Sequence, residues 1–81
     1  MPKLNSENQK NLISERLIDL RKLHHLSQRD LARKLQLEGY DIDKNVITRI
    51  ETNKRYVKDY EIRAFAQLFD VSYSYLIDGI K

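Results

Sequence analysis

The chain concentrates its positive charge on one short stretch, residues 44–58. This stretch holds five Lys or Arg side chains and one Glu, a charge of +4, whereas the whole chain of 81 residues has a net charge of +3. Residues 1–43 carry eight basic and seven acidic side chains, and residues 59–81 carry two basic and four acidic ones. Because the charge is concentrated rather than spread over the surface, the sequence indicates an anionic partner.

The residue types that catalyse reactions or bind metals do not form a recognisable site in this sequence. His24 and His25 are neighbours on an expected helix and therefore point about 100° apart, and the chain has no cysteine to complete a metal site. The sequence also has no Gly-rich phosphate loop, no cluster of carboxylates and no nucleophile beside a base. We therefore predict that the protein is not an enzyme and uses neither a metal nor a cofactor. Taken alone, the cationic stretch also fits a plain solvated helix face.

Helical periodicity supplies the elements that position the cationic stretch, because Gly and Pro are scarce and apolar residues recur every three or four positions. The expected helices are a first one starting between 7 and 11 and ending at 24, followed by 28–37, 44–52, 59–69 and 73–78. Ser27, Asp43 and Ser72 each precede a helix as capping residues, and Ser6 with Gln9 has capping-box spacing before the first. The sequence predicts a compact all-α domain of five helices.

The chain is long enough for one small domain and one core. We expect residues 11–79 to form this domain and residues 1–10 to be an N-terminal extension or the start of the first helix. The sequence has no apolar run typical of a signal peptide or a membrane-spanning helix, so a cytoplasmic protein is expected. A group of apolar and aromatic residues near the C-terminus allows two interpretations. It either closes the core or forms an exposed patch for self-association, and its members are Tyr73, Tyr75, Leu76, Ile77 and Ile80.

The second and third expected helices are short and joined by one connection, and the third is basic, which suits the major groove of duplex DNA. Here the chain resembles the Cro and phage-repressor type of helix-turn-helix protein, the XRE family. The resemblance rests on LRKLHHLSQRDLARKL (20–35), VITRIETNKR (46–55) and LFDVSYSYL (68–76). It covers roughly residues 12–78 and implies a lambda-repressor-like DNA-binding domain.

The chain departs from the family pattern at three places. The connection QLEGYDID, residues 36–43, is longer than the short turn that usually joins the second and third helices of the family. This connection therefore sets the angle at which the third helix would approach the DNA. His25 and Asn53 stand where the family commonly has glycine. Both residue types tolerate a left-handed backbone better than most other non-glycines, so we expect both turns to be kept.

The resemblance also implies roles for individual residues. It assigns contacts with base edges to Lys44, Asn45, Thr48 and Arg49, and a contact with a phosphate or an outer base to Gln28. From their positions, the start of the second helix at Ser27 and the residues just past the third helix are expected to contact phosphates, the latter being Lys54, Arg55, Tyr56 and Lys58. The chemistry agrees, since Arg and Lys donate to guanine, Asn pairs with adenine, and Thr offers a hydroxyl and a methyl group. Phosphate contacts fix the register of a protein on DNA without reading its sequence.

One ion pair is expected within the protein. Glu51 stands at the C-terminal end of its helix, where the helix dipole disfavours an anion, so a compensating cation is needed. The resemblance suggests Arg21 as that partner. Two independent surface charges are the alternative.

The function that follows is sequence-specific binding of double-stranded DNA by a transcriptional regulator, a repressor, with the helix at 44–52 in the major groove. Such modules usually bind as homodimers to pseudo-palindromic operators with half-sites about one helical turn, roughly 34 Å, apart. The protein would be associated with the nucleoid, and the sequence suggests neither a membrane nor a small-molecule ligand. The alternative is an antitoxin-like protein-interaction module whose DNA binding serves autoregulation.

Overall fold

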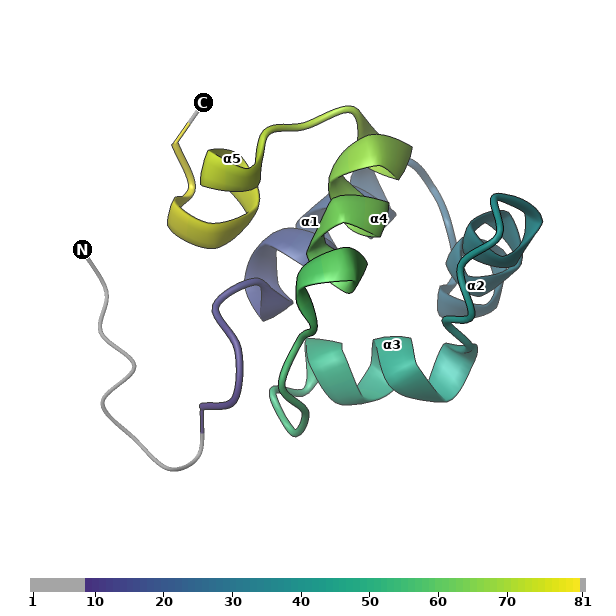
Figure 1. Ribbon diagram of the computed structural model, residues 1–81, viewed down its shortest axis with the longest axis horizontal. Helices are drawn as coiled ribbons and strands as arrows, with labels where there is room; N and C mark the ends of the chain where they lie inside the picture. Colours follow the sequence, from purple (N-terminus) through teal and green to yellow (C-terminus); the bar gives the residue numbers. More distant parts are fainter. Residues whose placement is uncertain (1–8, 81) are drawn as a thin grey trace.

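The architecture was obtained as a computed structural model that describes residues 9–80 (Figure 1). It consists of α1 (Ser14–Leu23), α2 (Gln28–Leu37), α3 (Lys44–Glu51), α4 (Asp59–Phe69) and α5 (Tyr73–Asp78). The described part of the chain contains no strand, so the all-α, five-helix prediction is confirmed. None of these helices is both long and apolar enough to cross a membrane.

The helix boundaries agree with the sequence prediction except at α1 and α3. α2, α4 and α5 have the predicted bounds, whereas α3 ends at Glu51, one residue before the predicted 52. α1 starts at Ser14 instead of between 7 and 11 and ends at Leu23 instead of 24. The predicted capping residue Ser6 lies outside the described residues.

The late start of α1 has a physical cause at Asn11. The side-chain oxygen of Asn11 accepts a hydrogen bond of 3.1 Å from the backbone N–H of Ile13. Its side-chain nitrogen donates to the carbonyl oxygens of Ile50 and Arg55, at 3.1 and 3.0 Å. Asn11 therefore fastens the segment before α1 to the end of α3, and this long-range bonding replaces the local helix that periodicity predicted.

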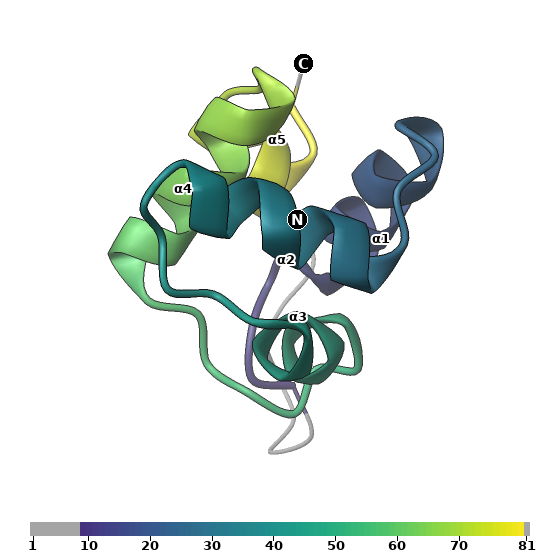
Figure 2. The same ribbon diagram turned by 90° about the vertical axis from the view of Figure 1, so that its right-hand side faces the viewer.

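All five helices contribute to one core. Leu17 of α1, Leu31 of α2, Ile47 of α3, Phe65 of α4 and Leu76 of α5 are each fully buried, with 0% of their surface exposed. Figure 1 shows α3 along the lower edge of the molecule, and in Figure 2, turned by 90°, α3 lies nearly end-on beneath α2. The other four described helices leave the outer side of α3 uncovered.

Three of the predicted helix caps are confirmed. Ser27, Asp43 and Ser72 each accept a hydrogen bond of 2.9 to 3.0 Å from a backbone N–H in the first turn of their helix. At α2 the bonding is reciprocal, because the carboxylate of Asp30 accepts from the backbone N–H of Ser27 at 3.1 Å. This capping box satisfies N–H groups that would otherwise lack partners at a helix start.

The two turns that lack glycine keep the left-handed conformation that the sequence predicted. His25 has a φ of 57° and Asn53 a φ of 59°. His25 ends the turn between α1 and α2, and Asn53 ends the turn after α3. The position of α2 and α3 relative to the core is therefore set by two turns that these residue types can adopt.

The long connection between α2 and α3 is held at several points. Ile42 is fully buried in the core, and Gly39 takes a φ of 95° where the chain leaves α2. The hydroxyl group of Tyr40 donates to the side-chain oxygen of Gln67 on α4 at 2.7 Å. The side chain of Gln36 donates to the carbonyl of Ile42 at 3.3 Å. These contacts fix the approach of the chain to the start of α3.

The C-terminal helix closes the core and also leaves apolar surface exposed. Leu76 is buried and Ile77 packs against the core, whereas 51% of Tyr73 and 59% of Ile80 remain exposed. The guanidinium group of Arg16 on α1 donates to the carbonyl oxygens at the end of α5, among them that of Ile77 at 2.9 Å. The core-closure interpretation thus holds for Leu76 and Ile77.

Candidate nucleic-acid interface

The outer side of α3 carries the residues that the sequence analysis selected as base readers. Lys44, Asn45 and Arg49 are exposed, and Thr48 is half-buried. Positions one, four and five residues apart cover one side of an α-helix. Ile47 and Ile50 occupy the other side and are fully buried. The burial of this apolar side fixes which face of α3 is directed outward.

Thr48 is tied to α2 through Gln28. Its hydroxyl oxygen lies 2.8 Å from the side-chain oxygen of Gln28 and 3.0 Å from the carbonyl oxygen of Lys44. The side-chain nitrogen of Gln28 donates to the carboxylate of Glu51 at 2.9 Å. Gln28, predicted as a phosphate contact, therefore uses both ends of its side chain for contacts within the protein. Its backbone N–H at the start of α2 and the second hydrogen of its NH₂ group are the donors left for a phosphate.

The predicted pair of Arg21 and Glu51 is formed. The guanidinium group of Arg21 donates twice to the carboxylate of Glu51, at 2.7 and 3.0 Å. It also donates to the carbonyl oxygen of Leu26 at 2.9 Å, in the turn between α1 and α2. Only 14% of the Arg21 side chain and 5% of the Glu51 side chain are exposed. A two-point contact of this kind fixes geometry as well as charge, so it holds α1, α3 and the start of α2 together.

At the start of α2, Ser27 is exposed and its hydroxyl group is engaged in the capping box. The hydrogen bond from the backbone N–H of Ser27, followed by that from its hydroxyl group, lowers the pKa of Asp30 from its usual value of 3.8. Asp30 therefore stays ionised at neutral pH, beside the backbone that was predicted to bind phosphate.

The loop after α3 separates the predicted phosphate contacts into two groups. Lys54 and Lys58 are exposed, and 70% of Tyr56 is exposed. Arg55 instead turns inward, and its guanidinium group donates to the carboxylate of Glu61 at 2.7 Å. Because only 19% of the Arg55 side chain is exposed, its first role is structural.

Glu61 was missed by the sequence analysis. Only 2% of its side chain is exposed, and besides Arg55 it accepts the backbone N–H of Lys58 at 2.9 Å. The available signal was half of a capping box, an acidic residue at the third position of α4. The usual Ser or Thr is absent three residues earlier, where Lys58 stands, so the motif was incomplete.

The segment before α1 adds a cation that the sequence analysis also missed. The side-chain oxygen of Asn53 accepts the backbone N–H groups of Lys10 and Asn11 at 2.6 and 2.8 Å. The amino group of Lys10 then lies 5.2 Å from the centre of the Tyr56 ring, a cation–π contact. No pattern around Lys10 indicates this position, because the hydrogen bonds that create it join residues more than forty positions apart.

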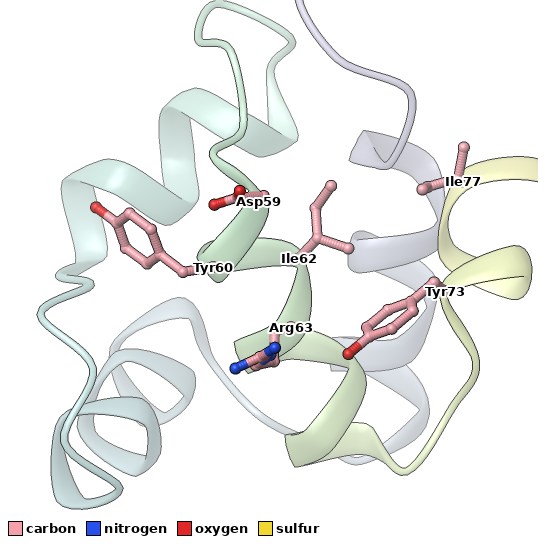
Figure 3. A pocket seen from close by; sticks show the side chains of 6 residues that line it. All are labelled: Asp59, Tyr60, Ile62, Arg63, Tyr73 and Ile77. Carbon is pink, nitrogen blue, oxygen red and sulfur yellow. The ribbon is translucent and has the colours of Figure 1, made fainter.

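A groove of about 540 Å³ lies between α4 and α5 (Figure 3). Asp59, Tyr60, Ile62 and Arg63 from α4 and Tyr73 and Ile77 from α5 line it. None of the predicted site residues is among them. Within residues 9–80, no group of three or more His, Cys, Asp or Glu side chains is arranged to hold a metal ion.

Comparison with known protein families gives a match that covers most of the chain. Residues 17–76 match the model of a helix-turn-helix family, the family of Cro and phage C1 repressors. Comparison with curated proteins and with solved structures gives no significant match. The matched residues include the turn at His25, the pair α2 and α3, and the Arg21–Glu51 contact. The chain therefore belongs to the Cro/C1-type, or XRE, family of helix-turn-helix proteins, which are DNA-binding transcription regulators.

Proposed function

We propose that the protein is a sequence-specific repressor that places α3 in the major groove of double-stranded DNA. The observation that carries the proposal is the outer side of α3, where Lys44, Asn45 and Arg49 are exposed above a fully buried apolar side. The major groove is about 12 Å wide and admits one α-helix. In this position Arg49 and Lys44 donate to guanine, and Asn45 pairs with adenine.

Phosphate contacts come from the loop after α3 and from the start of α2. Lys54, Lys58 and Tyr56 bind phosphates beyond the end of the helix, with Lys10 beside them, while the N–H groups at the start of α2, around Ser27, bind a phosphate on the other side. Arg55 supports this loop from within through Glu61. Because these contacts displace cations from DNA, affinity falls steeply as the salt concentration rises.

Repression then follows from occupancy, because a protein bound across a promoter blocks access of the polymerase. The protein acts as a homodimer on a pseudo-palindromic operator, and it is associated with the nucleoid. Each subunit presents one α3 to a half-site, with the half-sites about 34 Å apart.

Selection of bound duplexes from a random pool, at a stated salt concentration, tests the proposal. The expected result is one enriched motif with two-fold symmetry. Replacing Arg49→Ala should relax the preference at one or two positions of this motif, whereas Lys54→Ala should weaken binding to all duplexes about equally. Arg63→Ala is the matched control, because it removes the same charge from α4. A pool without enrichment, or equal effects of Arg49→Ala and Lys54→Ala on every duplex, would contradict the proposal.

A further inference from the structure

The orientation of the Gln28 side chain is fixed by chemistry. One end of its amide faces the carboxylate of Glu51 at 2.9 Å, and that carboxylate also accepts two hydrogen bonds from Arg21. An ionised carboxylate only accepts hydrogen bonds, so the end of Gln28 that faces Glu51 must be the NH₂ group. The other end, which faces Thr48, is therefore the oxygen.

This orientation determines what Thr48 can do. The oxygen of Gln28 has no hydrogen to give, so the hydroxyl group of Thr48 must be the donor across their distance of 2.8 Å. Among residues 9–80, the other hydrogen-bond partner of that hydroxyl group is the carbonyl oxygen of Lys44 at 3.0 Å, which is also an acceptor. A hydroxyl group has one proton, and either neighbour keeps it within the protein. Thr48 then presents a lone pair and a methyl group to its surroundings.

We infer that Thr48 reads a T·A base pair, as a hydrogen-bond acceptor and through its methyl group. This inference rests on the proposed placement of α3 in the major groove. Arg21, Glu51 and Gln28 act as positioning residues, since they hold the hydroxyl proton of Thr48 inside the protein. The chain of contacts runs from Arg21 to Glu51, from Gln28 to Glu51 and from Thr48 to Gln28.

The base pairs differ in the hydrogen-bonding and methyl groups that they present to Thr48 in the major groove. Guanine shows two acceptors in the major groove, N7 and O6, which an oxygen without a free proton cannot bind. A T·A pair shows the amino group of adenine, which donates, and the methyl group of thymine, which packs against another methyl group. A G·C pair offers the amino group of cytosine but no methyl group. Only the T·A pair matches both surfaces of Thr48.

The first experiment locates the base pair and then removes its groups one at a time. Selections with the wild type and with Thr48→Val identify the position whose preference depends on Thr48. Two modified duplexes are then made at this position. Uracil in place of thymine removes the methyl group, and 2-aminopurine in place of adenine removes the amino group from the major groove while keeping a pair with thymine.

Each modified base should affect only one of the two contacts of Thr48, through its methyl group or through its hydroxyl group. Uracil should weaken binding of the wild type and of Thr48→Val by about fourfold, the value of one buried methyl group, and should leave Thr48→Ser unchanged. 2-Aminopurine should weaken binding of the wild type and of Thr48→Ser by about two- to tenfold, the value of one hydrogen bond, and should leave Thr48→Val unchanged. Each variant is compared with itself on two duplexes, so a change in its overall affinity or stability cancels.

The second experiment tests the positioning residue. Gln28→Met keeps the approximate size of the side chain but removes the acceptor for the hydroxyl group of Thr48. It should reduce the loss that 2-aminopurine causes, because only the carbonyl oxygen of Lys44 at 3.0 Å then holds the hydroxyl proton of Thr48 and the hydroxyl group is oriented less firmly. In the Thr48→Val background, Gln28→Met should change nothing. If Gln28 acted only by binding a phosphate, Gln28→Met would weaken binding to both duplexes equally and would leave this ratio unchanged.

Several outcomes would overturn the inference while leaving the proposed function intact. One is a selected motif that depends on Arg49 but has guanine at the position read by Thr48. In that case, replacing this guanine with 7-deazaguanine, which lacks the N7 acceptor, would weaken DNA binding by the wild type but not by Thr48→Val. Another is a selected motif in which no position depends on Thr48. By contrast, the absence of any enriched motif would contradict the proposed function itself.

Discussion

Within residues 9–80, two Arg–Glu pairs are similarly buried, but Arg21 donates twice to Glu51 and Arg55 once to Glu61, and the pairs differ in their consequences. Both join their partners at 2.7 Å, and in both the Glu side chain is almost fully buried, with 5% of Glu51 and 2% of Glu61 exposed. Glu51 belongs to α3 and also accepts a hydrogen bond from Gln28. Glu61 belongs to α4 and also accepts the backbone N–H of Lys58.

The difference lies in what each second hydrogen bond holds in place. Through Gln28, the Arg21–Glu51 pair reaches Thr48 on the outer side of α3, so it orders a surface proposed to read bases. Through its backbone contact, the Arg55–Glu61 pair orders the loop that carries Lys54 and Tyr56, a surface proposed to bind phosphates. Under the proposed function, one buried carboxylate therefore supports specificity and the other supports affinity.

Removing the cation of either pair should have the largest effect on stability. Arg21→Met and Arg55→Met each leave a buried carboxylate without its counter-charge, and each should lower the free energy of unfolding by about 3 kcal/mol. Methionine keeps much of the apolar stem, so the loss reports the charge rather than the packing. Urea unfolding at neutral pH and low temperature measures the change.

The matched control is Arg33→Met, which removes an exposed cation from α2 and should change stability by less than about 0.5 kcal/mol. Combining Arg21→Met with Glu51→Leu should recover part of the loss, because a pair of apolar residues leaves no buried charge. If Arg55→Met behaved like Arg33→Met while Arg21→Met cost several kcal/mol, the two pairs would not be energetic equivalents.

Asn11 connects the regions of the two pairs, and its removal should have the next largest effect. Its side chain donates to the carbonyl of Ile50, next to Glu51, and to the carbonyl of Arg55. Asn11→Ala removes both of these hydrogen bonds, although the carbonyl of Ile50 keeps the one from the backbone N–H of Asn53 at 3.0 Å, and should lower the free energy of unfolding by about 2 kcal/mol. Hydrogen exchange of the amides in the loop at 52–58 should show where the opening occurs. Loss of protection confined to α5 would contradict this assignment.

The sequence predicted those parts of the molecule that depend on local rules. The caps at Ser27 and Asp43 follow from the residue before each helix, and the left-handed turns at His25 and Asn53 follow from residue types that tolerate that backbone. The bounds of α2, α4 and α5 were likewise predicted from local sequence patterns.

The parts that were missed depend on contacts between elements, which no pattern within one helix or turn specifies. Asn11 bonds to residues about forty positions away and displaces the start of α1, and Arg55 turns toward Glu61 instead of outward. The inward use of Gln28 depends on how closely α2 and α3 approach each other, which no local pattern encodes. The ten or so residues that the resemblance selected therefore needed the fold to divide them into exposed groups and internal supports.

Replacing the Arg of either pair should change the free energy of DNA recognition by less than it changes the free energy of unfolding. Arg21→Met removes two hydrogen bonds that hold Glu51, so Gln28 and Thr48 lose their fixed orientation. The discrimination between the best duplex and one changed at the Thr48 position should fall by about 1 kcal/mol. Arg55→Met should weaken binding to both duplexes by the same factor. Titrations of each variant at one salt concentration, under conditions where it is folded, measure both ratios.

If Arg55→Met changed the preferred sequence and Arg21→Met did not, the division between a carboxylate for specificity and one for affinity would be reversed. Arg63→Met, which alters a cation on α4 outside both pairs, should leave the preferred sequence unchanged. Equal changes in the preference for both Arg21→Met and Arg55→Met would instead indicate a general loosening of the domain.

Asp30 is only partly buried, in contrast to Glu51 and Glu61, and replacing it should have the smallest effect on stability. The backbone N–H of Ser27, followed by its hydroxyl group, lowers the pKa of Asp30 in the folded protein below its usual value of 3.8. The ionised form therefore stabilises the fold above pH 4, and this contribution is lost as the pH falls through the lowered pKa. Asp30→Asn should be less stable than the wild type at pH 7, and the difference should shrink as the pH approaches 3. Urea unfolding across this range measures it, and a constant difference between wild type and Asp30→Asn would mean that Asp30 acts through packing rather than through its charge.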